Sequence, residues 1–322
     1  MKKYVLTLLC PLWLVAQAQK PVATPEKPNV IIVIADDLGY GDLSCYGEKT
    51  IHTPAVDALA KQGLRFTNAH TTAATCTPSR YSLLTGLYNW RRNDTGIADG
   101  DVAMVIRPEQ TTIADLFKTA GYTTGAIGKW HLGLGAEKGG QDWNGFITPG
   151  ASDIGFDYSY LMAATADRVP CVWIENQRVA NYDPSAPISV SYRAPFEGEP
   201  TGKNNPELLT KLKPSPNHGH NQAIVNGISR IGYMKGGGKA LWTDEFIADT
   251  IVAKTVQYIN KHKNEPFFLY VGTNDVHVPR YPNRRFAGKS GMGYRGDVIL
   301  QFDWTIGEIV KALKENKIFD NT

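Results

Sequence analysis

The chain has 322 residues, of which 42% are hydrophobic and 20% are charged, and its formal net charge is +3. This length and apolar fraction allow a sizeable core in about one large domain or two small ones. The net charge is too small to indicate nucleic acid or a membrane surface as a partner, and the sequence has no long basic run. We therefore expect a globular protein with neither kind of partner.

The N-terminus has the pattern of a secretory signal peptide. A short basic start is followed by the apolar stretch 4–15, which is too short to span a bilayer, and then by Ala16-Gln17-Ala18. A buried N-terminal helix is the alternative, but the basic start and Pro11 favour a cleaved signal over residues 1–18. We expect export to the periplasm or to the outside of the cell.

Apolar, β-branched runs alternate with helix signals along the rest of the chain. The run 30–34 is the clearest strand, and a helix is expected from Thr53-Pro54 to Lys61, where a cap and an N-terminal proline coincide. The remaining predicted elements, in chain order, are a strand at 64–68, helices at 78–85 and 111–120, a strand at 123–127, a helix at 243–263, a strand at 267–271 and a helix at 297–316. This alternation predicts an α/β fold with an open, mostly parallel sheet flanked by helices on both faces.

The segment from about 133 to 241 interrupts this alternation. It is rich in Gly, Pro, Asn and aromatic residues, and it contains no repeat or low-complexity tract. We expect a long loop insertion within a single domain that covers 19–322. The aromatic residues of the insertion suit either a sugar site or ordinary loop packing.

Polar residues of unusual types follow the predicted strands. In chain order they are Asp36 and Asp37 after the first strand, Cys76 after the second, Lys129 and His131 after the third, and His277 after the fourth. Sites in open α/β sheets form beyond the carboxyl ends of the strands. We therefore expect these side chains to meet at one rim of the sheet.

The motif Asp36-Asp37-Leu38-Gly39 places two carboxylates together at a strand end. Adjacent carboxylates repel each other unless a cation or a positive side chain lies between them. Hard oxygen ligands of this kind favour calcium or magnesium. For this short motif taken alone, a solvated turn with a helix cap is the more common structure.

The string Cys76-Thr77-Pro78-Ser79-Arg80-Tyr81-Ser82-Leu83-Leu84-Thr85-Gly86 places a cysteine near the start of a helix. Pro78 fits the first helical turn, so Cys76 is expected beside the positive end of the helix dipole, where free N–H groups bind tetrahedral oxyanions. Arg80 adds a fixed positive charge. A nucleophile beside an anion cradle suits cleavage of a sulfate or phosphate ester. A buried structural cysteine is the alternative interpretation.

This string resembles the sulfatase signature Cys-x-Pro-Ser-Arg-x-x-x-Leu-Thr-Gly at every fixed position. Three shorter motifs occur in the order of that family: the Asp-Asp-Leu-Gly after the first strand, Gly128-Lys129-Trp130-His131, and His277-Val278-Pro279. The similarity extends from about Pro28 to the last residue. The signature is highly specific, whereas the short motifs would be weak alone.

The resemblance implies a modified nucleophile and a metal ion. In sulfatases the signature cysteine, here Cys76, is converted to Cα-formylglycine by a formylglycine-generating enzyme or an anaerobic sulfatase-maturating enzyme. Asp36, Asp37 and the modified residue 76 would bind Ca2+. The implied reaction is hydrolysis of sulfate esters, and the length and aromatic content of the insertion suit a sulfated glycan or its oligosaccharides as substrate.

The resemblance also implies roles for the other charged residues. One hydroxyl of the hydrated formylglycine would attack sulfur while Arg80 holds the hydrate. The second hydroxyl would lose its proton to His131, and this step would expel sulfate and regenerate the aldehyde. Lys129 and His277 would neutralise the sulfate and assist the leaving alcohol.

Contacts to the sugar are expected in two places. His218 and His220 lie in the insertion, and two histidines without a further evident ligand are a weak metal signal. A substrate contact is therefore the preferred interpretation, above all for His220. Further sugar contacts are expected from residues that flank His277, namely Asn274, Asp275 and Arg280.

The chain departs from the sulfatase pattern near its last residue. Sulfatases carry a second ligand pair, Asp-Asn followed by Gly, at the end of a later apolar strand, and a further lysine. Asp320-Asn321 does not match this pair, because only Phe319 separates it from the predicted helix end at 314–318. We expect an incomplete catalytic domain over 19–322, with an open slot in the sheet. If 322 residues are the whole product, we expect weak calcium binding, poor stability and little or no turnover.

Other interpretations remain open at this stage. One is a phosphomonoester or phosphonate hydrolase of the same alkaline-phosphatase-like fold, since some of these share the cysteine signature. Another is a truncated remnant that binds a glycan or nothing. A cysteine hydrolase with an unmodified Cys76 fits the signature least well. A disulfide between Cys45 and Cys171 is possible in an exported protein.

Overall fold

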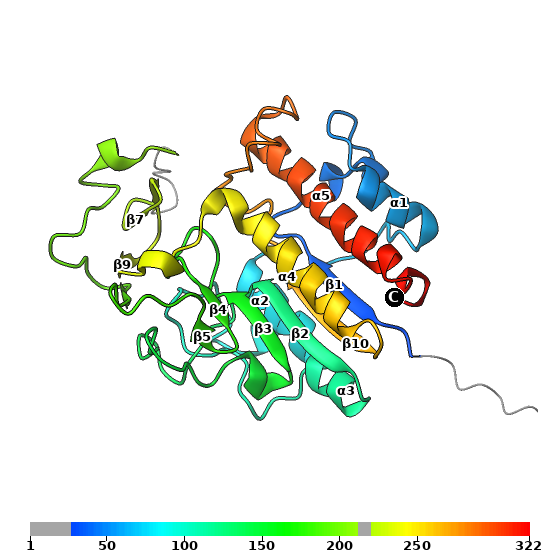
Figure 1. Cartoon of the computed structure of the whole chain (residues 1–322), viewed down its shortest axis with the longest axis horizontal. Helices are drawn as coiled ribbons and strands as arrows, with labels where there is room; N and C mark the ends of the chain where they lie inside the picture. Colours follow the sequence, from blue (N-terminus) through cyan, green and yellow to red (C-terminus); the bar gives the residue numbers. More distant parts are fainter. Residues whose placement is uncertain (1–26, 212–219) are drawn as a thin grey trace, which may run out of the picture.

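The computed structural model describes residues 27–211 and 220–322 (Figure 1). The signal peptide expected over 1–18 and His218 lie outside the described residues. Within them, no helix is both long enough and apolar enough to cross a membrane. Cys45, Cys76 and Cys171 are free thiols, so the Cys45–Cys171 disulfide that the sequence allows is not formed.

A six-stranded sheet forms the centre of the molecule, in the order β1-β10-β2-β3-β4-β5. The strands are β1 (Val30–Ile34), β10 (Phe267–Gly272), β2 (Thr123–Lys129), β3 (Tyr158–Met162), β4 (Trp173–Glu175) and β5 (Arg178–Val179). The first four are parallel, and β4 and β5 are antiparallel to their neighbours. The predicted open, mostly parallel sheet is therefore confirmed.

In the described residues, five α-helices accompany this sheet: α1 (Pro54–Gln62), α2 (Cys76–Thr85), α3 (Ile113–Thr119), α4 (Ile247–His262) and α5 (Gly293–Glu315). Tyr258 of α4 packs edge-on against Phe267 with ring centroids 5.8 Å apart. Phe117 of α3 stacks on the next residue, Phe268, at 4.4 Å. Because successive strand residues point to opposite faces, α3 and α4 cover opposite faces of the sheet. Figure 1 shows α4 lying across one face, with α5 and α1 beyond it.

Local sequence accounts for where these helices begin and end. Pro54 occupies the first turn of α1, where its missing N–H costs nothing. Thr112 caps α3, with its hydroxyl accepting from the Asp115 N–H while the Asp115 carboxylate accepts from the Thr112 N–H. Gly86 ends α2 in the left-handed conformation, with φ of 68°.

The strand predicted at 64–68 was wrong. Residues 64–68 form no strand, and Leu64 and Phe66 are 89% and 67% exposed. This apolar run has no neighbouring strand in the described chain to supply backbone partners, so its composition alone does not make it a strand. Cys76 therefore follows a long loop rather than a strand end.

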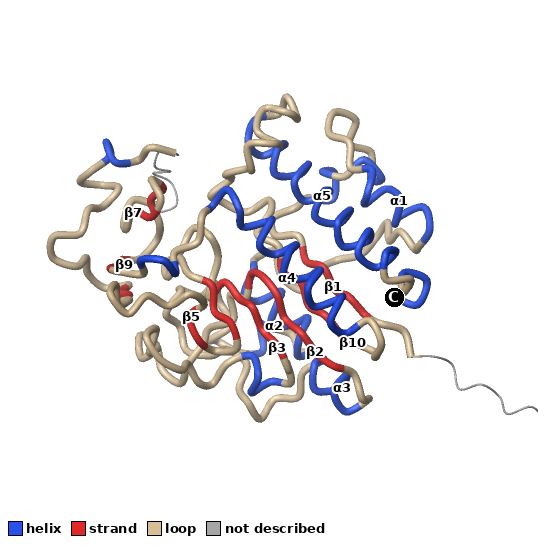
Figure 2. Tube along the Cα trace, viewed as in Figure 1, coloured by secondary structure: helices blue, strands red, loops and turns tan. Residues whose placement is uncertain are grey.

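The insertion also contains more regular structure than expected. β3, β4 and β5 extend the main sheet, and two small antiparallel pairs lie outside it: β6 (Ser189–Ser191) with β9 (Tyr233–Lys235), and β7 (Ile224–Val225) with β8 (Ile228–Ser229). Figure 2 shows these short strands joined by long loops at one side of the molecule. Strands of two or three residues leave too little periodicity in the sequence to be recognised.

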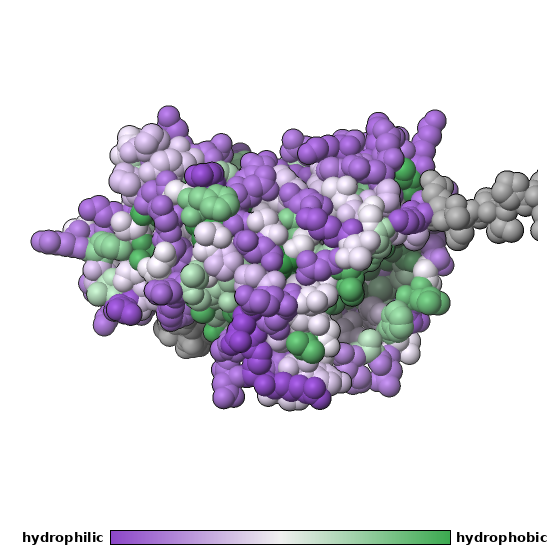
Figure 3. All heavy atoms as spheres, turned by 90° about the horizontal axis from the view of Figure 1, so that it is seen from below, coloured by the Kyte–Doolittle hydropathy of each residue, from purple (hydrophilic) through white to green (hydrophobic). Residues whose placement is uncertain are grey.

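Strand β1 differs from the other parallel strands in its surroundings. All residues of β10 are buried, whereas those of β1 are only half-buried, and β1 pairs within the described chain with β10 alone. A groove of about 810 Å³ opens beside its carboxyl end, between residues 34–38, the loop 70–76 and α2. Figure 3 shows a hollow bordered by hydrophobic side chains, on the side where the described chain begins. The rim of the sheet next to β1 is thus its most open part.

Candidate active site

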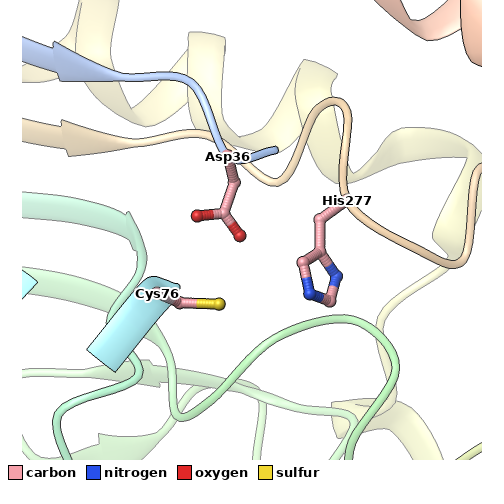
Figure 4. Close-up of side chains that lie close together, drawn as sticks. All are labelled: Asp36, Cys76 and His277. Carbon is pink, nitrogen blue, oxygen red and sulfur yellow. The ribbon is translucent and has the colours of Figure 1, made fainter. Parts of the chain in front are cut away.

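The polar residues that follow β1, β10 and β2 meet at the carboxyl end of the sheet, together with the first residue of α2. Ligand atoms of Asp36, Cys76 and His277 all lie within 4.8 Å of one another. Figure 4 shows the three side chains pointing toward a common space from three different segments. The structure therefore brings together the residues that the sequence placed at one rim, as expected for an open α/β sheet.

Cys76 is the first residue of α2 and is partly buried. Its Sγ lies 3.4 Å from Nζ of Lys129. Burial raises the pKa of the Cys76 thiol, and the nearby charges of Lys129 and Arg80 only partly oppose this effect. The unmodified thiol therefore stays protonated near neutral pH, which makes it a poor nucleophile by itself.

A buried charge cluster lies beside Cys76. Nη2 of Arg80 donates to Oδ1 of Asp36 at 3.0 Å, and Nζ of Lys129 forms an ion pair with Oδ2 of the same carboxylate. Arg80 is also held by the Lys129 carbonyl at 2.8 Å and by the Tyr270 hydroxyl at 2.7 Å. Burial alone would raise the pKa of Asp36, but Lys129, Arg80 and His277 lower it well below its ordinary value. Asp36 is therefore ionised under all ordinary conditions.

Asp37 lies next to this cluster but is more open. Its side chain is 44% exposed, its φ is 58°, and its Oδ2 lies 3.9 Å from Nε2 of His277. Two carboxylates at one strand end match the hard oxygen ligands that Ca2+ prefers. Since Ca2+ takes about 6–8 ligands, the two carboxylates alone would supply only part of such a site.

His277 is held by its Nδ1 atom. This atom lies 2.6 Å from the Val278 carbonyl and 3.1 Å from Oγ1 of Thr165. The carbonyl can only accept, so Nδ1 carries a proton and Nε2 is left to face Asp37. Burial lowers the pKa of His277, as does the charge of Lys129. The imidazole is therefore mainly neutral near pH 7.

His131 follows the end of β2 and is fully buried. Its Nε2 donates to the Ala98 carbonyl at 2.7 Å, while its buried Nδ1 has no hydrogen-bond partner among the residues that the structure describes. Burial lowers the pKa of His131 well below its usual value, and the charges of Lys129 and Arg168 lower it further. The ring is neutral and keeps an unused lone pair on Nδ1.

The loop that leaves β3 adds residues that the sequence did not single out. Asp167 is buried, and its Oδ2 lies 2.9 Å from Nε2 of His220, while Nη1 of Arg168 contacts both of its carboxylate oxygens at 2.9 Å. Burial would raise the pKa of Asp167, but His220 and Arg168 lower it below its ordinary value. The expected site residue His220 is thus fixed in orientation by an ionised aspartate.

This loop could have been found from the sequence. Asp167-Arg168 follows the aromatic and aliphatic run 158–162 after a few small residues, which is the same pattern of charge after a strand that marks Asp36. Asp167 and Arg168 were not selected from the sequence, because the segment 133–241 was assigned to loops. Recognition of β3 would have made Asp167 a candidate on the same argument as the other strand ends.

Asn274 and Asp275 brace the site from β10. The Asn274 side-chain oxygen accepts from Oγ1 of Thr165 and from the Ala166 N–H, both at 3.1 Å. Asp275 is buried and accepts from Nε2 of Gln301 at 2.9 Å, and its main-chain carbonyl accepts from the Asp36 N–H at 3.0 Å. Burial raises the pKa of Asp275 to about 7.

Arg280 lies three residues beyond His277, on the segment that leaves the site. It is half-buried, and its Nε donates to the Val276 carbonyl at 3.0 Å. Burial lowers the pKa of Arg280, and the charge of Arg295 lowers it further. This arginine is the most accessible of the expected sugar contacts on this segment.

The fold and the site together define the alkaline-phosphatase-like class. A family model described as Sulfatase matches residues 28–322, and the chain belongs to the sulfatase family. It is 59% identical over 297 residues to an N-acetylgalactosamine-6-O-sulfatase of Bacteroides thetaiotaomicron, which covers 92% of this chain and 57% of that relative.

Solved structures agree with this assignment. A sulfatase structure titled for the metabolism of multiple glycosaminoglycans by Bacteroides thetaiotaomicron superposes with a TM-score of 0.89 at 59% identity, over 92% of this chain and 61% of that chain. The phosphonate monoester hydrolase of Agrobacterium radiobacter superposes with a TM-score of 0.51 at 17% identity, over 92% of this chain and 61% of its own, and shares the fold alone. The chain thus spans less than two thirds of these relatives.

Proposed function

We propose that this protein hydrolyses sulfate esters of glycans or their oligosaccharides, with Cys76 converted to formylglycine and with Ca2+ as cofactor. The observation that carries the proposal is the convergence of Asp36, Cys76 and His277 within 4.8 Å, beside the buried cations Lys129 and Arg80. The similarity to an N-acetylgalactosamine-6-O-sulfatase supports a 6-sulfated amino sugar as the substrate class.

Asp36, Asp37 and the modified residue 76 would hold the calcium ion, which would supply positive charge for orienting the nucleophile and polarising a sulfate oxygen. Once converted by its maturating enzyme, residue 76 would offer a geminal diol, one hydroxyl of which is the nucleophile. Arg80 is kept in place by Asp36, Tyr270 and the Lys129 carbonyl, and it holds this group.

Lys129, His277 and His131 divide the remaining work. Nζ of Lys129 lies 3.4 Å from Sγ of Cys76. Lys129 would therefore neutralise negative charge on a sulfate bound next to residue 76. His277 presents Nε2 and, in its protonated form, donates to the leaving alcohol. His131 keeps an unprotonated Nδ1, which accepts the proton of the second hydroxyl as sulfate leaves.

The proposed sugar contacts are His220 and Arg280. Asp167 fixes the ring of His220, and this pair suits recognition of a sugar hydroxyl. Arg280 would contact the sugar from the segment that follows His277, where it is half-buried. Asn274 and Asp275, expected from the sequence as sugar contacts, are proposed instead to act mainly by bracing the loops around His277. Export of the protein remains part of this proposal.

The test is production of the protein together with a formylglycine-generating enzyme. Trypsin releases the peptide 66–80, whose mass falls when one oxygen replaces the sulfur and two hydrogens of Cys76. With calcium present, the converted protein should release sulfate from N-acetylgalactosamine 6-sulfate, and the matched Cys76→Ala variant should not. Conversion without any release of sulfate would reject the proposal for this chain and would favour a non-catalytic role.

A further inference from the structure

The hydroxyl of Thr77 lies at the centre of a closed ring of hydrogen bonds. Oγ1 of Thr77 donates to the His131 carbonyl at 2.8 Å and accepts from the Ala98 N–H at 3.2 Å. The Ala98 carbonyl then accepts from Nε2 of His131 at 2.7 Å. All three residues are buried, so water does not compete for these bonds.

This ring fixes the protonation pattern of His131. A carbonyl oxygen can only accept, so the contact with Ala98 requires a proton on Nε2 and leaves the lone pair on Nδ1. The Ala98 N–H and the Ala98 carbonyl belong to two successive peptide groups that meet at the Ala98 Cα. Thr77 holds the first of these groups, and the same hydroxyl also holds the His131 carbonyl. The hydroxyl of Thr77 therefore ties the backbone of Ala98 and of His131 to one point, beside the contact between the Ala98 carbonyl and Nε2 of His131.

We propose that Thr77 is a positioning residue, which holds the backbone of Ala98 and of His131 together so that His131 keeps its proton on Nε2 and offers Nδ1 as the proton acceptor. This inference rests on the proposed function only where it assigns Nδ1 of His131 as the proton acceptor in catalysis. The tautomer of His131 is a property of the folded chain and does not depend on that function. Position 77 is the open position of the Cys-x-Pro-Ser-Arg signature. Recognition by a maturating enzyme therefore does not require threonine there, and its hydroxyl is free to serve this other role.

The alternative is that Thr77 is merely a buried residue of suitable size. Thr77→Val keeps the shape and removes the hydroxyl, whereas Thr77→Ser keeps the hydroxyl and removes a methyl group. Thr255 offers a matched control, because it is equally buried and its Oγ1 has no hydrogen-bond partner in the described chain. Thr255→Val thus makes the same chemical change at a place that does not touch His131.

The experiment is ring ¹⁵N NMR of the whole chain labelled at histidine. The chain has 7 histidines, and the signals of His131 are assigned by their loss in His131→Gln. In the unsubstituted protein, Thr77→Ser and Thr255→Val, we expect one protonated nitrogen, Nε2, and one unprotonated nitrogen, Nδ1. In Thr77→Val we expect loss of this single pattern and averaged signals from both tautomers.

Two outcomes would overturn the proposal. One is an Nδ1-protonated His131 in the unsubstituted protein, a result that needs no variant and holds even if Thr77→Val fails to fold. The other is an unchanged Nε2 pattern in Thr77→Val. Neither depends on turnover, so the proposal can fail while sulfate hydrolysis is demonstrated, and it can hold while hydrolysis is absent.

Discussion

Two buried arginines, one in the insertion and one in the active site, have contrasting surroundings. In the insertion, Nη2 of Arg230 donates to both carboxylate oxygens of Asp244 at 2.8 Å, and the two side chains are 0% and 1% exposed. In the site, Arg80 shares the single carboxylate of Asp36 with a second cation, Lys129.

The difference separates a structural ion pair from a binding site. The Arg230–Asp244 pair is neutral as a unit, so its charges are satisfied without any ligand. The buried cluster of Arg80, Lys129 and Asp36 has one positive charge in excess, and it lies beside Cys76. Buried charge without a partner is costly, so a cluster of this kind favours an added anion such as a sulfate ester.

The largest effect is expected from breaking the ion pair between Arg230 and Asp244. Arg230→Ala leaves Asp244 buried without its cation and should lower the free energy of unfolding by about 3–5 kcal/mol. Urea denaturation measures this change. Arg284→Ala is the control: Arg284 pairs with Glu245 but its side chain is 83% exposed, so the midpoint should not move. Equal shifts in both variants would contradict the contrast between buried and exposed pairs.

A smaller effect on stability and a large one on activity are expected from Lys129→Ala. Arg80 still neutralises Asp36 in this variant, so the free energy of unfolding should fall less than in Arg230→Ala. The site loses its excess charge, and kcat/KM for a sulfate ester should fall about 100-fold or more. Parallel kinetics and urea denaturation test this. If Lys129→Ala were as destabilised as Arg230→Ala and kept its activity, the excess charge would have no catalytic role.

The smallest effect, counted per pH unit, concerns the pH dependence of stability. The pKa of Asp275 is raised to about 7 in the folded chain from an ordinary value of 3.8. Between these values the folded state binds more protons than the unfolded state, so this residue lowers stability as pH rises through the window. The slope is at most about 1.4 kcal/mol per pH unit. Asp275→Asn should flatten the fall between pH 4 and pH 7, measured by urea denaturation, and an unchanged slope would contradict this origin.

The same contrast explains how much the sequence could predict. Around the site, long β-branched runs and helix signals located β1, β2, β10 and the helices within a few residues, and the strand ends then brought Asp36, Lys129 and His277 together. In the insertion, strands of two or three residues gave no usable period. β3 and the Asp167–Arg168 pair at its exit were missed because the whole Gly-, Pro- and Asn-rich segment was assigned to loops.

The opposite error at 64–68 has a related cause. Apolar residues there suggested a strand, but strand formation depends on a neighbouring strand that composition does not reveal. Hydrogen-bond partners across long sequence separations were equally invisible, as with Thr77 and His131 or Asp167 and His220. Residue types could be predicted as candidates, whereas their orientation required the folded chain.

The most direct test of sulfate ester hydrolysis compares a sulfate ester and a phosphate ester of the same alcohol. The measurement is kcat/KM of the formylglycine-containing protein with calcium, with Cys76→Ala as the blank. We predict a higher kcat/KM for the sulfate ester, and loss of both activities in Cys76→Ala. A higher kcat/KM for the phosphate ester would contradict it and would assign the site to a phosphomonoester or phosphonate hydrolase on the same fold.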